Sequence, residues 1–178
     1  INPDGSVTML LDKVGDRPLV YADDIAIATD GTIYVSEAST RFGASEYGGT
    51  YAASLLDVME HGGHGQVIEF RPDTGAARVL VSGLNFANGL AISDDQAYLL
   101  IAETGSYRIL KHWLQGAKTG HTEVLVDNLP GFPDNINNGL QGRFWIGLVA
   151  PRDTLLDAAS DIPLLREIVQ RLPERYRP

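Results

Sequence analysis

The sequence contains no cysteine, so disulfide bonds and cysteine-based zinc sites are excluded. It also lacks any run of about 18–20 apolar residues, the length that a transmembrane helix needs. Basic residues are in the minority: 14 Lys and Arg stand against 23 Asp and Glu, which gives a formal net charge of −9. Because binding to a nucleic-acid backbone depends on Lys and Arg, we expect no nucleic-acid partner. Clustered carboxylates on such a chain would instead attract cations.

The sequence does contain a motif that occurs three times. Each copy has an Asp or Asn residue before a short apolar strand, then a polar turn and a second strand. The copies span residues 22–35, 87–100 and 133–146. Repetition of this kind indicates an array of similar structural units. Aligning the copies superimposes Asp23, Asn88 and Asp134.

The repeated unit has the size of a propeller blade. Between Asn88 and Asn128 the pattern predicts four strands, at residues 89–92, 98–102, 107–113 and 122–126. Four antiparallel strands in roughly 40–45 residues are typical of a β-propeller. The preceding unit is longer because residues 41–64 are inserted, and within them residues 51–60 have helical spacing of apolar side chains. A further strand is predicted at residues 7–11, after a turn.

We therefore predict an all-β fold: a β-propeller of which this chain covers about three blades, with helical insertions at 41–64 and 150–178. In the second insertion, residues 153–173 predict one or two helices broken near Pro163. A closed propeller needs 4–8 blades. We thus expect residues 1–178 to be part of a single propeller domain, incomplete at both ends. Further blades or a second copy should cover the open blade edges, which carry unpaired backbone groups.

Convergence of the repeats predicts a cation site. Calcium prefers six to eight oxygen ligands from carboxylates, amides, carbonyls and water. The candidate ligands, at equivalent positions of successive units, are Asp23, Asp24, Asn88, Asp134 and Asn135. The alternative is that these side chains only bond nearby backbone N–H groups, as Asp and Asn often do at turns and strand ends.

Other polar and aromatic residues have simpler interpretations. The sequence His61-Gly62-Gly63-His64 has the spacing of a two-histidine metal clamp, but its glycines favour a loop after a helix. Glu103 and Arg108 predict an exposed ion pair across a turn, which would contribute little to stability. Phe86 and Phe132 precede the motif at matching places, where they could line a pocket mouth but are better explained as core residues.

The sequence offers no complete catalytic apparatus. There is no Gly-x-Ser-x-Gly motif and no Ser/His/Asp set that the pattern brings together. A hydrolase built from these residues would use the metal as its electrophile. We expect the catalytic residues to lie outside this chain.

Several segments closely resemble the strictosidine synthase family. They are Ala87–Ser93, Ala102–Thr104, Tyr107–Ile109 and Leu129–Ile136. The segment Phe144–Leu148, followed by Pro151 and Arg152, is similar to the branch of the family that includes adipocyte plasma-membrane-associated proteins. The resemblance covers essentially all 178 residues. It implies a six-bladed propeller related to the paraoxonases and to the gluconolactonase and regucalcin group.

The resemblance also implies a ligand set and a range of functions. By analogy with paraoxonases, a central Ca2+ would be held at Asp23, Asn88, Asp134 and Asn135, with Asp24 beside a second, structural calcium. The implied function is a calcium-dependent esterase or lactonase acting on a small-molecule substrate. The alternatives are an enzyme that condenses an amine with an aldehyde, as strictosidine synthase does, and a binding propeller without catalysis. The paraoxonase Glu ligand and catalytic His pair would lie before Ile1, and the acidic base of strictosidine synthase would lie beyond Pro178.

Overall fold

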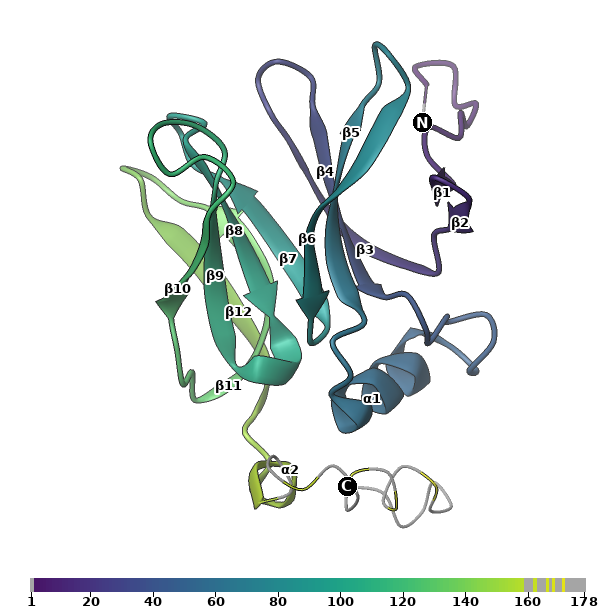
Figure 1. The fold of residues 1–178 in the computed structure, drawn as a ribbon, viewed down its shortest axis with the longest axis vertical. Coiled ribbons are helices and arrows are strands. Elements are labelled where there is room, and N and C mark those ends of the chain that lie inside the picture. Colours follow the sequence, from purple (N-terminus) through teal and green to yellow (C-terminus); the bar gives the residue numbers. More distant parts are fainter. Residues whose placement is uncertain (1, 159–161, 163–165, 167, 169–170, 172–178) are drawn as a thin grey trace.

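The computed structural model describes residues 2–158, 162, 166, 168 and 171, and its main feature is a set of antiparallel sheets packed side by side (Figure 1). The first sheet contains β3 (Tyr21–Ile27), β4 (Ile33–Ser39), β5 (Gly65–Arg71) and β6 (Ala76–Leu84). The second contains β7 (Ala87–Ile92), β8 (Tyr98–Glu103), β9 (Arg108–Trp113) and β10 (Thr122–Val126). The third contains β11 (Gly131–Asn138) and β12 (Phe144–Pro151).

Strands that follow one another in the chain are neighbours in each sheet, which is the arrangement of a propeller blade. The chain therefore forms two complete four-stranded blades and the first two strands of a third. This confirms the predicted all-β propeller and its coverage of about three blades. The strands predicted between Asn88 and Asn128 correspond to β7 to β10, with shifts of one or two residues at their ends.

The remaining elements are short. They are β1 (Lys13–Val14), β2 (Arg17–Pro18), α1 (Thr50–Glu60), the 3-10 helix η1 (Thr104–Ser106) and α2 (Thr154–Ala158). Helix α1 confirms the helix predicted at residues 51–60. Helix α2 begins the second insertion, whereas residues 163–165 around the predicted break lie outside the described part. No described helix has the length and hydropathy needed to cross a bilayer.

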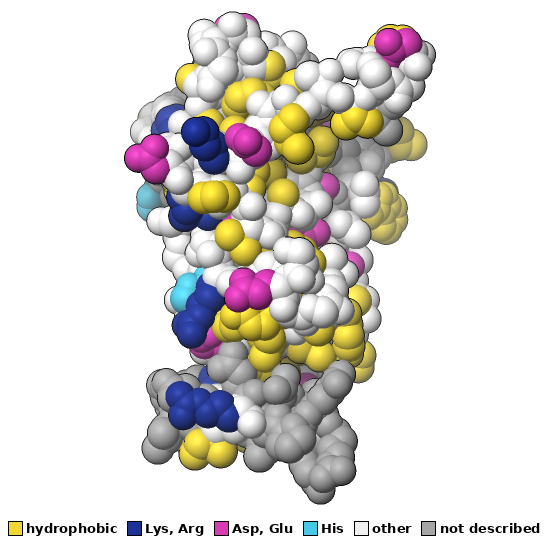
Figure 2. Space-filling model, turned by 90° about the vertical axis from the view of Figure 1, so that its right-hand side faces the viewer, with side chains coloured by type: hydrophobic (Ala, Val, Ile, Leu, Met, Phe, Trp, Pro, Cys, Tyr) yellow, Lys and Arg dark blue, Asp and Glu magenta, His cyan; other side chains and the backbone are white. Residues whose placement is uncertain are grey.

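The strand predicted at residues 7–11 is wrong, because these residues belong to no strand. Val7 and Met9 are 78% and 75% exposed. Apolar alternation alone does not hold a strand when no partner strand is available to pair with it. Figure 2 shows hydrophobic side chains spread over the side of the molecule that carries this N-terminal segment.

The core lies on both sides of the second blade. Side chains alternate along β8, so Leu99 and Ile101 pack toward the first blade while Leu100 and Ala102 pack toward β11. All six residues of β7 are buried, because β3 and β4 lie on one side of it and β11 on the other. This packing brings the first strands of three successive blades next to each other, and these strands carry the repeated motif.

Candidate cation site at three aligned bulges

Asp23, Asn88 and Asp134 each lie in a β-bulge on the first strand of a blade. In every case two residues of the first strand stand opposite one residue of the second strand. The bulged pairs are Asp23-Asp24 opposite Ser36, Asn88-Gly89 opposite Ala102, and Asp134-Asn135 opposite Gly147. Asp23, Asn88 and Asp134 therefore occupy equivalent positions in the strand pairing, as the repeats predict.

The bulges also correct one detail of the prediction. The repeats predict the Asp and Asn residues before the strands, but these residues lie within β3, β7 and β11. A bulge accommodates an extra residue and redirects side chains without ending the strand. Bulges therefore allow polar side chains to interrupt an apolar strand pattern, which looks like a loop in the sequence.

The bulges pack directly against one another. A Cβ atom on Gly89 would lie 2.5 Å from both the carbonyl oxygen of Asp134 and the backbone nitrogen of Ile136, so only glycine allows the β7 and β11 bulges to approach this closely. On the other side, the backbone N–H of Leu90 donates to Oδ2 of Asp24 at 2.8 Å. The three bulges thus form one continuous region across three blades.

Asn88 has the most informative environment of the candidate ligands. Its side chain is 5% exposed, and its Oδ1 atom is buried without a hydrogen-bond partner among the described residues. A buried polar atom without a partner costs roughly 1–3 kcal/mol. An amide oxygen in this state matches the oxygen ligands that calcium prefers. The observation therefore fits a cation at this position.

The carboxylates around Asn88 affect one another. The pKa of Asp23 is raised to about 6, first by burial of its carboxylate and then by the negative charges of Asp134 and Asp24. The residue as a whole is nevertheless accessible to solvent. Asp134 and Asp23 also raise the pKa of the Tyr21 phenol, although burial is the larger cause. A cation would relieve this repulsion.

The described residues nevertheless contain no group of three or more His, Asp or Glu side chains arranged to hold a metal on their own. The predicted site therefore depends on asparagine amides in addition to carboxylates. Asp23, Asn88 and Asp134 fit such a site by their placement on adjacent bulges. The full set of ligands stays a prediction.

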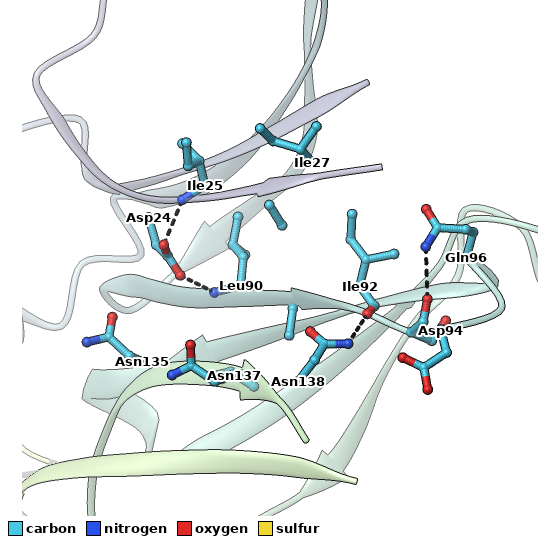
Figure 3. A pocket seen from close by; sticks show the side chains of 14 residues that line it. Asp24, Ile25, Ile27, Leu90, Ile92, Asp94, Gln96, Asn135, Asn137 and Asn138 are labelled. Atoms are coloured by element: carbon cyan, nitrogen blue, oxygen red, sulfur yellow. Dashed lines mark hydrogen bonds between the residues drawn. The ribbon is translucent and has the colours of Figure 1, made fainter. Parts of the chain in front are cut away.

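Asp24 has a clear structural role. Its Oδ1 accepts the backbone N–H of Ile25 and its Oδ2 accepts that of Leu90, both at 2.8 Å (Figure 3). The carboxylate thereby links the first blade to the second. This is the alternative that the sequence left open, in which an Asp side chain bonds backbone N–H groups. Its role as a calcium ligand stays a prediction.

Asn135 lies at the edge of a cavity of about 650 Å3 between β3, β7 and β11. Three asparagines of β11, Asn135, Asn137 and Asn138, line one wall (Figure 3). All three are exposed, and Asn138 donates from Nδ2 to the carbonyl oxygen of Ile92 at 2.7 Å. The wall that β11 contributes to this cavity beside the bulges is thus polar.

The aromatic and histidine candidates behave largely as expected. Phe86 is 3% exposed and belongs to the interior, which confirms the core interpretation, while Phe132 is half-buried with its ring 4.7 Å from that of Tyr107. The residues from His61 to His64 form the connection between α1 and β5, with His61 as the C-terminal cap residue of the helix. The favoured loop interpretation is confirmed.

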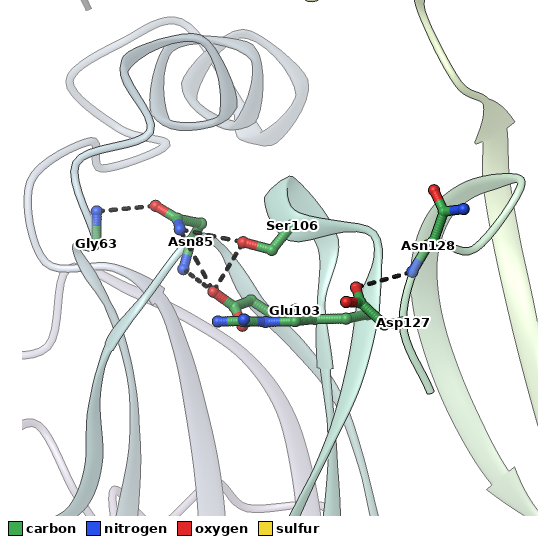
Figure 4. A network of polar contacts seen from close by, with 7 residues as sticks. Gly63, Asn85, Glu103, Ser106, Asp127 and Asn128 are labelled. Carbon is green, nitrogen blue, oxygen red and sulfur yellow. Dashed lines mark hydrogen bonds and ion pairs between the residues drawn. The ribbon is translucent and has the colours of Figure 1, made fainter. Parts of the chain in front are cut away.

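The ion pair predicted between Glu103 and Arg108 is confirmed, but the predicted exposure of Glu103 is wrong. Its side chain is fully buried, and it accepts hydrogen bonds from Arg108 Nε at 2.5 Å, the Asn85 N–H at 2.9 Å and the Ser106 hydroxyl at 3.0 Å (Figure 4). Asn85 lies in the connection between β6 and β7, so the network fixes the entry to the second blade. Local spacing predicts the partner Arg108 but carries no information about the burial of Glu103.

Glu37 occupies the equivalent position in the first blade. It is also fully buried, pairs with Arg17 at 2.6 Å, and accepts the N–H of Val20 and the side-chain amide of Gln66. Both glutamates stand directly after the residue opposite the bulge, in the segments Ser36-Glu37 and Ala102-Glu103. That shared position is a signal in the sequence from which their structural role could have been inferred.

Comparison with known proteins supports the assignment of the fold. Residues 23–117, more than half of the chain, match the family model of strictosidine synthase. Strictosidine synthase-like protein 13 of Arabidopsis thaliana is 32% identical over 97% of this chain and 41% of its own length. Adipocyte plasma membrane-associated protein of Salmo salar is 33% identical over 97% of this chain and 42% of its own length. The chain thus spans less than half of the curated relatives it matches.

Solved structures give the same architecture. A gluconolactonase from Xanthomonas campestris superimposes with a TM-score of 0.64 at 21% identity, over 83% of this chain and 47% of that one. Regucalcin from Agrobacterium tumefaciens, described as a calcium-binding protein, gives 0.52 at 16% identity over 71% and 38%. At these identities the likeness establishes the fold alone. The match of residues 23–117 to the family model shows that the chain belongs to the strictosidine synthase family.

Proposed function

We propose that the complete protein is a calcium-dependent hydrolase of ester or lactone bonds. The observation that carries the proposal is the buried, unpartnered Oδ1 of Asn88 at the middle one of three adjacent bulges. The proposal is also supported by the gluconolactonase and calcium-binding descriptions of proteins with a similar fold. Because this chain spans about two fifths of its curated relatives, the proposal concerns the whole protein.

The residues of the three bulges would hold the cation from one side. Asn88 supplies an amide oxygen that no described residue satisfies, and Asp23 and Asp134 supply charge from the neighbouring blades. Asn135 stands beside them at the cavity. Calcium, when bound, would polarise the carbonyl oxygen of an ester. Other ligands, and the base that activates water, would come from water molecules and from the rest of the protein.

Asp24 and Gly89 would serve the site indirectly. Asp24 fixes the distance between the first two bulges through the backbone of Leu90, and Gly89 allows the third bulge to pack against the second. Preorganisation of this kind keeps ligands in place before the ion binds, which favours affinity. The cavity of about 650 Å3 beside the bulges could accommodate part of a small substrate.

The test uses the full-length protein with aryl esters and lactones, assayed with calcium and with a chelator. We expect chelation to abolish hydrolysis and Asn88→Ala to reduce kcat/KM by at least about tenfold, since it removes a ligand oxygen. Asn137→Ala is the matched control, because Asn137 is an exposed asparagine of the same cavity that is not a proposed ligand. We expect the calcium dependence of its activity to be unchanged.

Activity that survives both the chelator and Asn88→Ala would refute the metal mechanism. The same protein should be incubated with tryptamine and an aldehyde. Condensation without ester hydrolysis would favour the synthase instead. Absence of both activities, with calcium binding retained, would favour a binding propeller.

We also propose that further blades, or a second copy, cover the outer sheet faces. The supporting observation is the exposure of apolar side chains on both flanking sheets: Ile25 and Ile27 on β3 are 58% and 62% exposed, and Trp145 and Val149 on β12 are 67% and 66% exposed. Within a propeller such side chains pack against the adjacent blade. Light scattering of the full-length protein would distinguish a monomeric ring from an assembly of copies.

A further inference from the structure

Helix α1 lies beside the end of the first two blades at which β3 and β7 begin (Figure 1). The phenol of Tyr21, two residues before Asp23, donates to the carbonyl oxygen of Thr50 in the first turn of α1 at 3.1 Å. On the other side of the helix, the N–H of Gly63 donates to Oδ1 of Asn85 at 3.0 Å, just before β7 (Figure 4). The insertion is thus attached at both ends next to the strands that carry the candidate cation site.

The C-terminal half of α1 concentrates polar atoms that lack partners. Among the described residues, five buried side-chain atoms have no hydrogen-bond partner, and four of them belong to this half of the helix and its cap residue. They are both carboxylate oxygens of Asp57, Oε2 of Glu60 and Nδ1 of His61. Because buried polar atoms are nearly always satisfied in stable structures, this concentration marks a segment whose packed position is costly.

Asp57 makes the packing of α1 depend on charge. The helix has three buried residues, Ala53, Asp57 and Met59, so one of the side chains with which it packs is a carboxylate. A protonated carboxyl group can be buried at modest cost, whereas the ionised form loses its hydration and costs more. Movement of the helix away from the sheet would return the ionised group to water.

The groups that face Asp57 compensate its charge only in part. His64 before β5, Arg41 after β4 and the hydroxyl of Ser39 each oppose the rise in its pKa, while Glu60 on α1 adds to the rise. Burial outweighs these groups and raises the pKa of Asp57 to about 6. Arg41 and His64 both pair with Glu60, so neither cation is committed to Asp57.

Glycines flank the helix. Gly49 directly precedes it with φ 123°, and Gly63 follows its cap with φ 68°. Glycine adopts such angles without strain, and positions of this kind can absorb the backbone rotation that moves a helix as a unit. Arg166 opposes the movement, since its Nη1 donates to the carbonyl oxygen of Val58 at 3.2 Å.

We propose that α1 is a lid over the entry to β3 and β7, and that it opens more readily when Asp57 carries its charge. The open state exposes the end of the first two blades beside the bulges, and it requires no cation there. The pKa of Asp57 is higher in the closed state than its ordinary value of 3.8, so closing takes up a proton. The closed lid is therefore favoured at low pH, and opening increases as the pH rises from about 4 to about 6.

Amide hydrogen exchange of the full-length protein at pH 5 and pH 7, followed by mass spectrometry, measures the opening. After correction for intrinsic exchange rates, we expect residues 50–60 to open about tenfold more often at pH 7. Asp57→Asn should make opening at pH 7 rarer by at least about tenfold and remove the difference between the two pH values. Glu46→Gln is the matched control, because Glu46 is an exposed acid of the same insertion and its variant should change neither result.

Strand β8, which lies in the core of the second blade, serves as the internal reference, and its slow exchange in both variants verifies an intact fold. Exchange of α1 as slow as that of β8 at both pH values would overturn the proposal. Fast exchange that Asp57→Asn does not slow would also overturn it, because the helix would then move without control by this charge. Equal slowing by Asp57→Asn and Glu46→Gln would assign the effect to net charge rather than to the buried carboxylate, which likewise contradicts the lid.

Discussion

Glu103 and Asp57 are both fully buried carboxylates, but their surroundings are opposite. Glu103 has a guanidinium, a backbone N–H and a hydroxyl as partners. Neither oxygen of Asp57, on α1, has a hydrogen-bond partner among the described residues. Burial alone therefore does not define the role of a carboxylate, because its partners decide whether the charge is compensated.

The two residues belong to different parts of the fold. Glu103 lies at the position that Glu37 occupies in the first blade, so both complete blades have a buried, hydrogen-bonded glutamate there. Asp57 lies in the insertion between β4 and β5, which has no counterpart in the second blade. The pKa of Asp57 is raised to about 6, mainly by burial, although the nearby Ser39 hydroxyl partly opposes the shift. The repeated glutamate position is thus electrostatically compensated, whereas the carboxylate in the insertion is only weakly compensated.

Removing the buried carboxylate of Glu103 should have the largest effect on the free energy of unfolding. Glu103→Ala leaves the N–H of Asn85 and the guanidinium of Arg108 without their acceptor, and we expect a loss of about 3–5 kcal/mol in the free energy of unfolding. Denaturant titration of the full-length protein measures it. The control is Glu123→Ala, which removes a partly exposed pair with Lys118 and a hydrogen bond from Trp113 Nε1 and should cost much less.

A double variant sharpens this prediction. In β12 the equivalent of Glu103 is Leu148, so an apolar residue is compatible with this blade position. Replacing Glu103 and Arg108 together by leucine should restore most of the stability that Glu103→Ala loses, because no charge is left buried alone. If the double variant were as unstable as Glu103→Ala, the ion pair itself would stabilise the fold, and the loss in Glu103→Ala would not come from leaving partner groups unpaired.

Removing the charge of Asp57 should instead increase the free energy of unfolding. Asp57→Asn removes a buried charge, and we expect it to stabilise the full-length protein at pH 7 by about 2–3 kcal/mol, the equivalent of the raised pKa. The pKa is higher in the folded state, so the protonated form is favoured there. The contribution of Asp57 to stability is present below about pH 4 and is lost as the pH rises through about 6.

The measurement for Asp57 is the free energy of unfolding between pH 4 and pH 8. The difference between the variant and the unaltered protein should grow with pH over this range. Asp12→Asn serves as the control, since Asp12 is an exposed aspartate and its variant should show no such trend. A stability difference independent of pH would show that Asp57 acts through packing rather than charge.

The same contrast explains how much of the molecule could be predicted from its sequence. The blades and the equivalence of Asp23, Asn88 and Asp134 were predictable, because strand alternation and turn residues repeat along the chain. The same repetition places Glu37 and Glu103 at equivalent positions, which indicates a structural role. The isolation of Asp57 was not predictable, because it depends on which side chains meet in three dimensions and Asp57 lies outside the repeat. The failure of the predicted strand at residues 7–11 has the same origin, since pairing requires a partner.

Asn88 offers the finest comparison, because its Oδ1 is buried and unpartnered like the oxygens of Asp57 but lies in the predicted calcium site. The proposed ligands of this chain would approach the ion from three blades and would leave part of the calcium shell to other groups. We therefore expect calcium at ten times its Kd to stabilise the full-length protein by about 1.4 kcal/mol, and residues 1–178 alone by much less. Thermal melting with calcium and with a chelator measures both. Asn88→Ala should abolish the calcium-dependent shift, and Asp57→Asn should retain it. A shift lost equally in both variants would show that the unpartnered oxygens of Asn88 and Asp57 do not differ in function.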